Sequence, residues 1–156
     1  MYQFEIITTR DEWALYKNDW QQIIKENNAD NPFLDFDLLN MWWKHVGENH
    51  CVEIHLCKKD GEIQGFWPLQ RTPTKQGDHY QFIGDLDLNY MDFIIREHQK
   101  SEIIPMFLKQ LLTAENPVLL ELRGIEENSS SNEVVEHTCI KEQYLYNFTR
   151  TVSPYT

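Results

Sequence analysis

The chain has 156 residues, of which 41% are hydrophobic and 13% aromatic, and it carries a formal net charge of −11. This size suits a single folded domain over residues 1–156, and the composition excludes a disordered chain. The acidic charge argues against a nucleic-acid partner and against an anionic membrane surface.

The N-terminal residues and the cysteines predict a cytoplasmic protein. Residues 1–7 have neither a basic segment nor a long apolar run, so we expect no signal peptide. No apolar stretch of the sequence approaches the roughly 20 residues that a membrane-spanning helix requires. The three cysteines are few and odd in number, which fits a reducing compartment better than a disulfide framework.

The first half of the chain predicts a strand, two helices and a β-hairpin. Polar and apolar residues alternate over residues 2–8, as in a half-buried strand. A capping box and apolar residues at helical spacing predict a helix over residues 9–24, and a second helix is expected at 35–45. Two β-rich segments, 51–58 and 62–70, flank an Asp-Gly turn and predict the hairpin.

The second half predicts four more strands and two more helices. The strands, in order, are 79–83, 91–95, 117–123 and 144–152. After the second of them, a helix is expected to open at about Ser101. After the third, Ser130 and Glu133 form a capping box that predicts the fourth helix.

The turn before the helix at Ser101 lies where a phosphate-binding turn would lie. Such turns use glycines, so that backbone N–H groups can approach a pyrophosphate at the helix N-terminus. Arg96 stands at one end of this turn, but Gln99 and Ser101 occupy positions where glycine would allow close approach. The layout suggests a cofactor-binding fold, whereas the turn argues against cofactor binding in the usual way.

The expected class is α+β, with a mixed sheet of about six to seven strands and four helices in the order β-α-α-β-β-β-α-β-α-β. Short segments accompany this order, namely Asn31–Leu34, Trp42–His45 before Gly47, Asp60–Leu69, Phe82–Gly84, Tyr90–Phe93 and Leu120–Gly124. Together they resemble the N-acetyltransferase (GNAT) superfamily. The resemblance is closer to its proteins with two tandem halves, as in cellulose-biosynthesis-type and FemAB-like acyltransferases.

The resemblance implies a first half that lacks the cofactor loop. In such two-half proteins the first half is usually degenerate, and the second carries the acetyl-CoA loop Gln/Arg-x-x-Gly-x-Gly/Ala. Arg96 fits the first position, while Gln99 and Ser101 depart from the other two. We therefore expect a chain that is inactive alone and acts with a second acetyltransferase-like half or as a homodimer. No cofactor is expected in this chain alone; acetyl-CoA is the cofactor if the family activity is retained.

The acidic connection after residue 84 contributes most of the candidate substrate site. Asp85 and Asp87 begin the spacing of an EF-hand loop, but Tyr90 stands where that loop needs glycine, so we reject an EF-hand. A weaker carboxylate site for a cation or a substrate amine, with Tyr90 and Asp92, is one hypothesis. The alternative is a solvated acidic loop.

Two adjacent tryptophans, Trp42 and Trp43, complete the candidate substrate-binding set. They point about 100° apart on a helix, so we expect one to pack on the sheet and the other to border a groove. Ordinary packing or a subunit contact is the alternative for the exposed one.

Metal ligation is not expected. Cys51, Glu53, His55 and Cys57 alternate along one strand, so they share one face opposite apolar neighbours. Same-face residues lie about 7 Å apart, and one strand cannot close them around a tetrahedral metal. One buried face and one polar face is the simpler interpretation.

Catalytic residues stay unassigned. Acetyl transfer needs a backbone site for the thioester and a group that takes the amine proton. Glu53, Glu121 and Asp92 could each take that proton, and the sequence does not choose among them.

Three functions remain open. The first is an acetyltransferase-like domain that needs a partner half or a dimer. The second is a non-catalytic binding or interaction module on the same scaffold. The third is a working acetyltransferase with an unusual loop, in which the helix N-terminus and backbone amides attract the phosphate.

Overall fold

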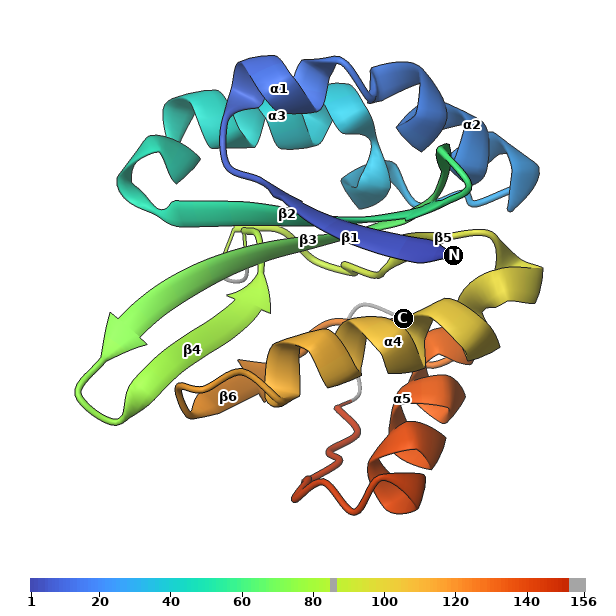
Figure 1. Ribbon diagram of the computed structural model, residues 1–156. Coiled ribbons are helices and arrows are strands. Elements are labelled where there is room, and N and C mark those ends of the chain that lie inside the picture. Colours follow the sequence, from blue (N-terminus) through green and yellow to red (C-terminus); the bar gives the residue numbers. More distant parts are fainter. Residues whose placement is uncertain (85–86, 152–156) are drawn as a thin grey trace.

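The computed structural model describes residues 1–84 and 87–151. Over these residues six strands and five α-helices follow one another as in Figure 1. The strands are β1 (Tyr2–Ile7), β2 (Cys51–Lys59), β3 (Glu62–Thr74), β4 (Gly77–Phe82), β5 (Ile94–Ile95) and β6 (Val118–Glu121). The α-helices are α1 (Arg10–Ala14), α2 (Lys17–Glu26), α3 (Phe36–His45), α4 (Lys100–Leu112) and α5 (Ser130–Lys141). Three 3₁₀ turns are η1 (Pro32–Leu34), η2 (Gly47–Asn49) and η3 (Glu97–Gln99).

The sheet is mixed, which confirms the expected α+β class. Its order is β1-β2-β3-β4-β6, and β5 pairs with β3. Neighbours from β1 to β4 are antiparallel, whereas β6 lies parallel to β4. The predicted hairpin of β2 and β3 is confirmed. Asp60 and Gly61 join the two strands with positive φ angles of 53° and 86°, as a two-residue hairpin turn requires.

One edge of β3 is shared by two separate strands. β3 pairs with β4 along its second half and with β5 at Gly65 and Phe66. The Ile83 N–H still donates to the Pro68 carbonyl (3.2 Å) before the chain leaves this edge. The predicted strand 91–95 is therefore too long, because only the two residues of β5 pair with β3.

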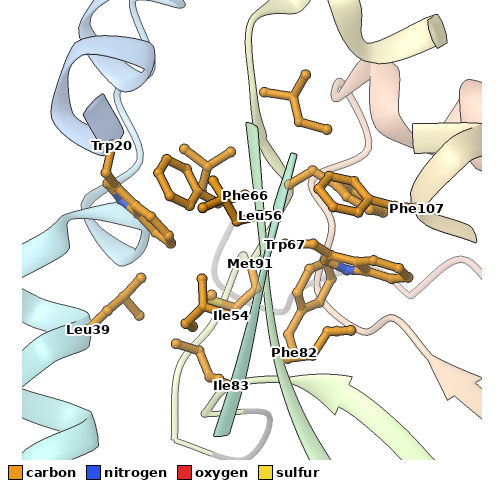
Figure 2. Close-up of a cluster of buried hydrophobic side chains, with 14 of the residues drawn as sticks. Trp20, Leu39, Ile54, Leu56, Phe66, Trp67, Phe82, Ile83, Met91 and Phe107 are labelled. Carbon is orange, nitrogen blue, oxygen red and sulfur yellow. The ribbon is translucent and has the colours of Figure 1, made fainter. Parts of the chain in front are cut away.

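Helices cover both faces of the sheet. α1, α2 and α3 lie on one face, and α4 and α5 lie on the other (Figure 1). Alternation along the strands sends Leu56 and Phe66 toward the first layer and Trp67 toward the second (Figure 2). Trp67 meets Phe107 of α4, with ring centroids 5.8 Å apart. Because both faces are covered, the middle of β3 is buried at every position.

The first predicted helix is in fact two helices, α1 and α2. The Thr9 cap is confirmed, since its Oγ1 accepts the N–H of Glu12 (3.2 Å). Tyr16, between the two helices, leaves the helical conformation (φ −104°, ψ 11°). Its ring packs edge-on against Phe66 of the sheet, with centroids 6.2 Å apart. This tertiary contact accompanies the break, and a local sequence pattern does not contain it.

The C-terminal predictions need two corrections. The final predicted strand, 144–152, is wrong over 144–151, which belong to no strand, and Val152 lies outside the described residues. A strand needs a hydrogen-bonded neighbour for its backbone groups, and no described strand pairs with this segment. The cap of α5 is Ser129 rather than Ser130: its Oγ accepts the N–H of Ser131 (3.2 Å).

Two buried tryptophans offer a matched test of one core hydrogen bond. Trp13 and Trp20 are both 0% exposed. The Trp20 Nε1–H donates to the Leu34 carbonyl (2.8 Å), whereas Trp13 Nε1 has no hydrogen-bond partner among the described residues. Trp20→Phe is expected to cost about 1–2 kcal/mol more than Trp13→Phe, because only the former leaves a buried carbonyl unsatisfied. Urea unfolding of both variants measures this difference, and equal costs would contradict it.

Candidate functional site

The candidate site lies where β4 and β6 separate. Their last parallel pair is Gln81 and Glu121. Beyond it, one chain continues to Gly84 and the other to Gly124. Residues 84–93, here called the excursion, leave the sheet at this point and return to it at β5; residues 85 and 86 of the excursion are not described. In open sheets that contain parallel strands, ligands bind beyond the strand ends at such a separation.

Described residues of the excursion contact the helical layer on one side and the segment after β6 on the other. Trp42 Nε1–H donates to Asp87 Oδ2 (3.0 Å), and the Asn31 side-chain amide donates to the Tyr90 carbonyl (2.6 Å). On the β6 side, a Cβ added to Gly124 would lie 3.2 Å from the Tyr90 backbone nitrogen. The backbone of Tyr90 therefore packs directly against Gly124, just beyond the end of β6.

A small pocket remains beside the excursion. Its volume is about 220 Å³, below the range of about 300–1,000 Å³ that is usual for small-molecule sites. It is lined by Ala29, Asp30, Asn31, Leu34, Tyr90, Met91, Asp92, Glu126 and Ser129. A larger hollow of about 340 Å³ lies outside α2 and contains none of the predicted site residues. The pocket beside the excursion is therefore the candidate ligand site.

Asp92 connects the excursion to the start of α5. Its Oδ2 accepts from Ser129 Oγ (2.6 Å), and its Oδ1 accepts from Ser131 Oγ (2.6 Å) and from the Phe93 N–H (2.7 Å). A carboxylate at a helix N-terminus also interacts favourably with the helix dipole. Both oxygens of Asp92 are thus engaged in holding α5.

The expectation that one of Trp42 and Trp43 borders a groove is wrong, because both side chains are buried. Trp42 and Trp43 are 7% and 5% exposed, so neither borders an open groove. Trp43 packs against Trp13, with centroids 5.5 Å apart. Trp42 is covered because η2 folds back over it: a Cβ on Gly47 would lie 2.8 Å from its ring. The glycine after α3, which predicted the helix end, also allows this close approach.

The structure brings part of the predicted substrate set together. Trp42 and Asp87 share a hydrogen bond, and Tyr90 and Asp92 line the pocket. Trp43 faces the aromatic core instead. Asp85 lies outside the described residues. Tyr90 itself is 37% exposed and has a positive φ of 57°, an uncommon conformation for a non-glycine residue.

Arg96, in the turn before α4, is not free to meet a phosphate. Arg96 Nε donates to Glu26 Oε2 (2.6 Å), and its Nη1 donates to the Ile63 carbonyl (3.2 Å). The hydrogen bond from Arg96, followed by one from Gln22, holds the pKa of Glu26 below its ordinary value. Arg96 is therefore directed toward α2 rather than toward the helix start.

The other two loop residues do not form a cradle either. Gln99 Nε2 donates to Gln64 Oε1 (2.6 Å), and Ser101 is exposed on the surface of α4. Gln99, at the cap position of α4, makes no side-chain capping bond.

Glu97 places a carboxylate at the start of α4. Its side chain accepts from Ser130 Oγ of α5 and pairs with Lys100 Nζ (3.0 Å). Burial alone raises the pKa of Glu97, but the hydrogen bonds from Ser130 and Lys100 outweigh it and hold the pKa below its ordinary value. The carboxylate is therefore ionised at neutral pH. Glu97 was not among the residues predicted from the sequence, because its partner Ser130 lies 33 residues away.

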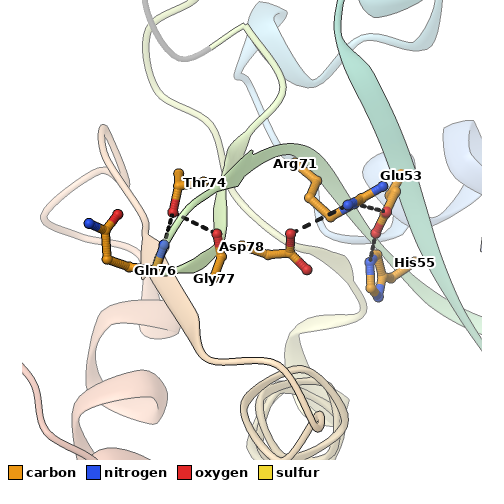
Figure 3. Close-up of polar contacts among 7 residues, drawn as sticks. All are labelled: Glu53, His55, Arg71, Thr74, Gln76, Gly77 and Asp78. Carbon is orange, nitrogen blue, oxygen red and sulfur yellow. Dashed lines mark hydrogen bonds and ion pairs between the residues drawn. The ribbon is translucent and has the colours of Figure 1, made fainter.

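A second polar cluster lies on the sheet itself (Figure 3). Glu53 Oε1 accepts from Arg71 Nε (2.8 Å), Glu53 Oε2 lies 3.2 Å from His55 Nε2, and Arg71 Nη1 lies 3.4 Å from Asp78 Oδ1. The expected polar face of β2 is thus largely buried, with His55 8% and Cys57 0% exposed. α4 and neighbouring strands cover it, which the alternation of one strand cannot show. Arg71 and Asp78 were missed, because they come from β3 and β4.

The three possible proton acceptors all have partners. Glu53 is held by Arg71 and His55, and Asp92 by the serines of α5. Glu121 pairs with Arg123 Nη2 (2.8 Å) and lies 3.2 Å from His79 Nε2. Within residues 1–84 and 87–151, no group of three His, Cys, Asp or Glu side chains is placed to hold a metal ion.

The fold agrees with solved acetyltransferase structures. No protein-family model and no curated protein sequence matches the chain. A structure described as a possible acetyltransferase from Clostridium difficile 630 superposes with a TM-score of 0.53 at 11% identity, over 100% of this chain and 97% of that one. An aminoglycoside acetyltransferase from an uncultured soil metagenomic sample gives a TM-score of 0.53 at 10% identity, over 99% and 98%. The chain therefore has the GNAT fold, and identities this low carry the fold alone.

No described helix is long and apolar enough to cross a lipid bilayer.

Proposed function

We propose that this chain is an acetyltransferase-like domain that does not bind acetyl-CoA alone and works with a partner half or as a dimer. The observation that carries the proposal is the Glu97 carboxylate at the start of α4, where an active domain would present bare backbone N–H groups to a pyrophosphate.

Electrostatics at this helix start favour exclusion of the cofactor. A helix N-terminus stabilises an anion by about 0.3–1 kcal/mol, and by up to about 2 kcal/mol when partly buried. A pyrophosphate here would meet the like charge of the Glu97 carboxylate, although solvent screens this repulsion because the Glu97 side chain is 59% exposed. Neither nearby cation is unpaired and able to offset this repulsion, because Lys100 is paired with Glu97 and Arg96 with Glu26.

The separation of β4 and β6 supports the same proposal. In the GNAT fold, the sheet backbone near the strand ends would hold the thioester. Here the Tyr90 backbone packs against Gly124, and Asp92 is bonded to Ser129 and Ser131. A thioester would have to displace the excursion before it could reach the sheet.

Calorimetric titration with acetyl-CoA tests the proposal. We expect the chain alone to bind no tighter than millimolar, and a micromolar Kd would overturn the proposal. Glu97→Gln is expected to tighten binding at least tenfold, because it removes the like charge and keeps the side-chain size. Glu48→Gln, an exposed change on η2 with the same effect on net charge, is the control and should leave the affinity unchanged. Equal affinities for the wild type and Glu97→Gln would exclude the carboxylate as the cause.

A non-catalytic interaction module is the second candidate. It is favoured by the engagement of every possible proton acceptor, namely Glu53, Glu121 and Asp92. The two candidates differ in their partner. A neighbouring gene that encodes Gln/Arg-x-x-Gly-x-Gly, and whose product acetylates an amine only in the presence of this chain, would favour the two-half enzyme.

A further inference from the structure

The sheet has an unpaired edge at β6. Among the described strands, β6 pairs only with β4, so its other side has no strand neighbour within this part of the chain. Its Leu119 side chain is 64% exposed. Exposed strand edges of this kind are templates for an added strand.

The same molecule carries a segment suited to pair with such an edge. Residues 144–151 belong to no strand, although they are rich in aromatic and β-branched residues. Leu145 is 104% exposed, Tyr146 43% and Phe148 42%. An exposed apolar segment that pairs with no described strand is typical of an interaction element.

Charge favours pairing between the two. The segment 144–151 contains Arg150 and no acidic residue, in a protein of net charge −11. β6 and its connections, residues 115–127, contain four glutamates and one arginine. Arg150 already lies 3.5 Å from Glu127 in that acidic stretch. The edge and the segment are therefore complementary in charge as well as in hydrogen bonding.

Within one molecule the segment does not reach the edge. Gln143 adopts a left-handed conformation (φ 58°), and the Tyr144 N–H donates to the Cys139 carbonyl (2.9 Å) to close the end of α5. After this cap, residues 144–151 pair with no described strand. In a two-fold symmetric dimer, residues 144–151 of each copy could pair with the β6 edge of the other copy. This arrangement would provide hydrogen-bond partners for both the segment and the edge, and it would leave the cap at the end of α5 unchanged.

We infer that the partner of this chain is a second copy, and that residues 144–151 of each copy add a strand to the β6 edge of the other. This inference rests on the proposed function, which requires a partner, and it names both the partner and the surface.

Sedimentation equilibrium tests the inference first. We expect a dimer at micromolar concentration, and a monomer up to about 100 µM would overturn it. Leu145→Asp with Phe148→Asp on the segment, and Leu119→Lys on the edge, should each weaken dimerisation more than tenfold, since charges block strand addition. The control is Leu15→Asp, a 78% exposed position between α1 and α2, which should leave the dimer intact.

Cross-linking then separates exchange from folding back within one chain. In a Cys51→Ser background, mixed Leu119→Cys and Leu145→Cys chains should form a covalent dimer on mild oxidation. A disulfide that forms only inside a chain carrying both changes would overturn the exchange. The acetyl-CoA titration does not depend on this outcome: a dimer that binds the cofactor tightly contradicts the proposed function alone, and a monomer that does not bind it contradicts the exchange alone.

Discussion

Replacing Gly77 with alanine is expected to lower the free energy of unfolding by about 3 kcal/mol. Gly77 begins β4 at a φ of +138°, and a Cβ there would lie 2.2 Å from the Pro117 carbonyl oxygen. That oxygen accepts the Asp78 N–H (2.9 Å) and starts the parallel pairing of β4 with β6. Thr74 Oγ1 also donates to the Gly77 carbonyl (2.7 Å; Figure 3). The added methyl group would force β6 away from β4.

Gly61→Ala is the matched control for this prediction. Gly61 also has a positive φ (86°), but a Cβ there would meet nothing within 4 Å. Gly61→Ala should therefore lower the free energy of unfolding by about 1 kcal/mol, which is the strain of a positive φ at a residue with a Cβ. Urea unfolding of the two variants gives the comparison, with an unchanged m-value as the check for two-state behaviour. Similar costs would show that the approach of Pro117 is not what limits position 77.

Replacing Glu53 with alanine is expected to cost about 2–3 kcal/mol, because it leaves Arg71 and His55 without their shared partner. The Glu53 side chain is 12% exposed and Arg71 is 31% exposed, so the cost is below that of a fully buried pair. Burial alone raises the pKa of Glu53, but hydrogen bonds from His55 and Arg71 outweigh it and hold the pKa below its ordinary value of 4.5.

The sign of the pH dependence follows from this lowered pKa. Stabilisation by Glu53 is complete above about pH 4.5 and is lost as the pH falls through the lower pKa of the folded state. The variant should therefore lose less stability than the wild type between neutral and acidic pH. Thermal or urea unfolding across this range measures the slope. Glu5→Gln, which removes an exposed pair with Lys58, is the control and should cost less than about 1 kcal/mol. Parallel pH curves for wild type and Glu53→Ala would contradict the prediction.

Local signals account for what the sequence predicted well. The Asp60-Gly61 turn, the Thr9 cap and the Asp35 cap act over a few residues; Asp35 Oδ1, for example, accepts the Leu38 N–H (3.0 Å). The turn and the Thr9 cap were enough to predict the hairpin and the start of α1, and the structure adds that Asp35, at the expected start of the second helix, caps it. The order of the elements then indicated the GNAT fold.

Distant contacts account for what the sequence did not predict. Asp92 bonds to Ser129 across 37 residues, and Arg96 bonds to Glu26 across 70. Neither pair follows a periodic pattern. The candidate residues Asp87, Tyr90 and Asp92 were found from their acidic and aromatic character, but their role in holding the excursion depends on partners from other elements. The burial of both Trp42 and Trp43 depends on the turn η2 in the same way.

Along one edge of β3, pairing with β4 stops before pairing with β5 begins. Pro68 of β3 lies at the position where the pairing with β4 stops. The Pro68 carbonyl accepts from Ile83 on this edge, and in an antiparallel pair the same residue would also donate its N–H to that partner. Proline has no N–H, so Ile83 gains one bond where other residues would gain two. The chain can therefore turn away at this position without leaving a donor unsatisfied in β3. A proline in a central strand is usually unfavourable, but here it determines where the neighbouring strand stops and the excursion begins.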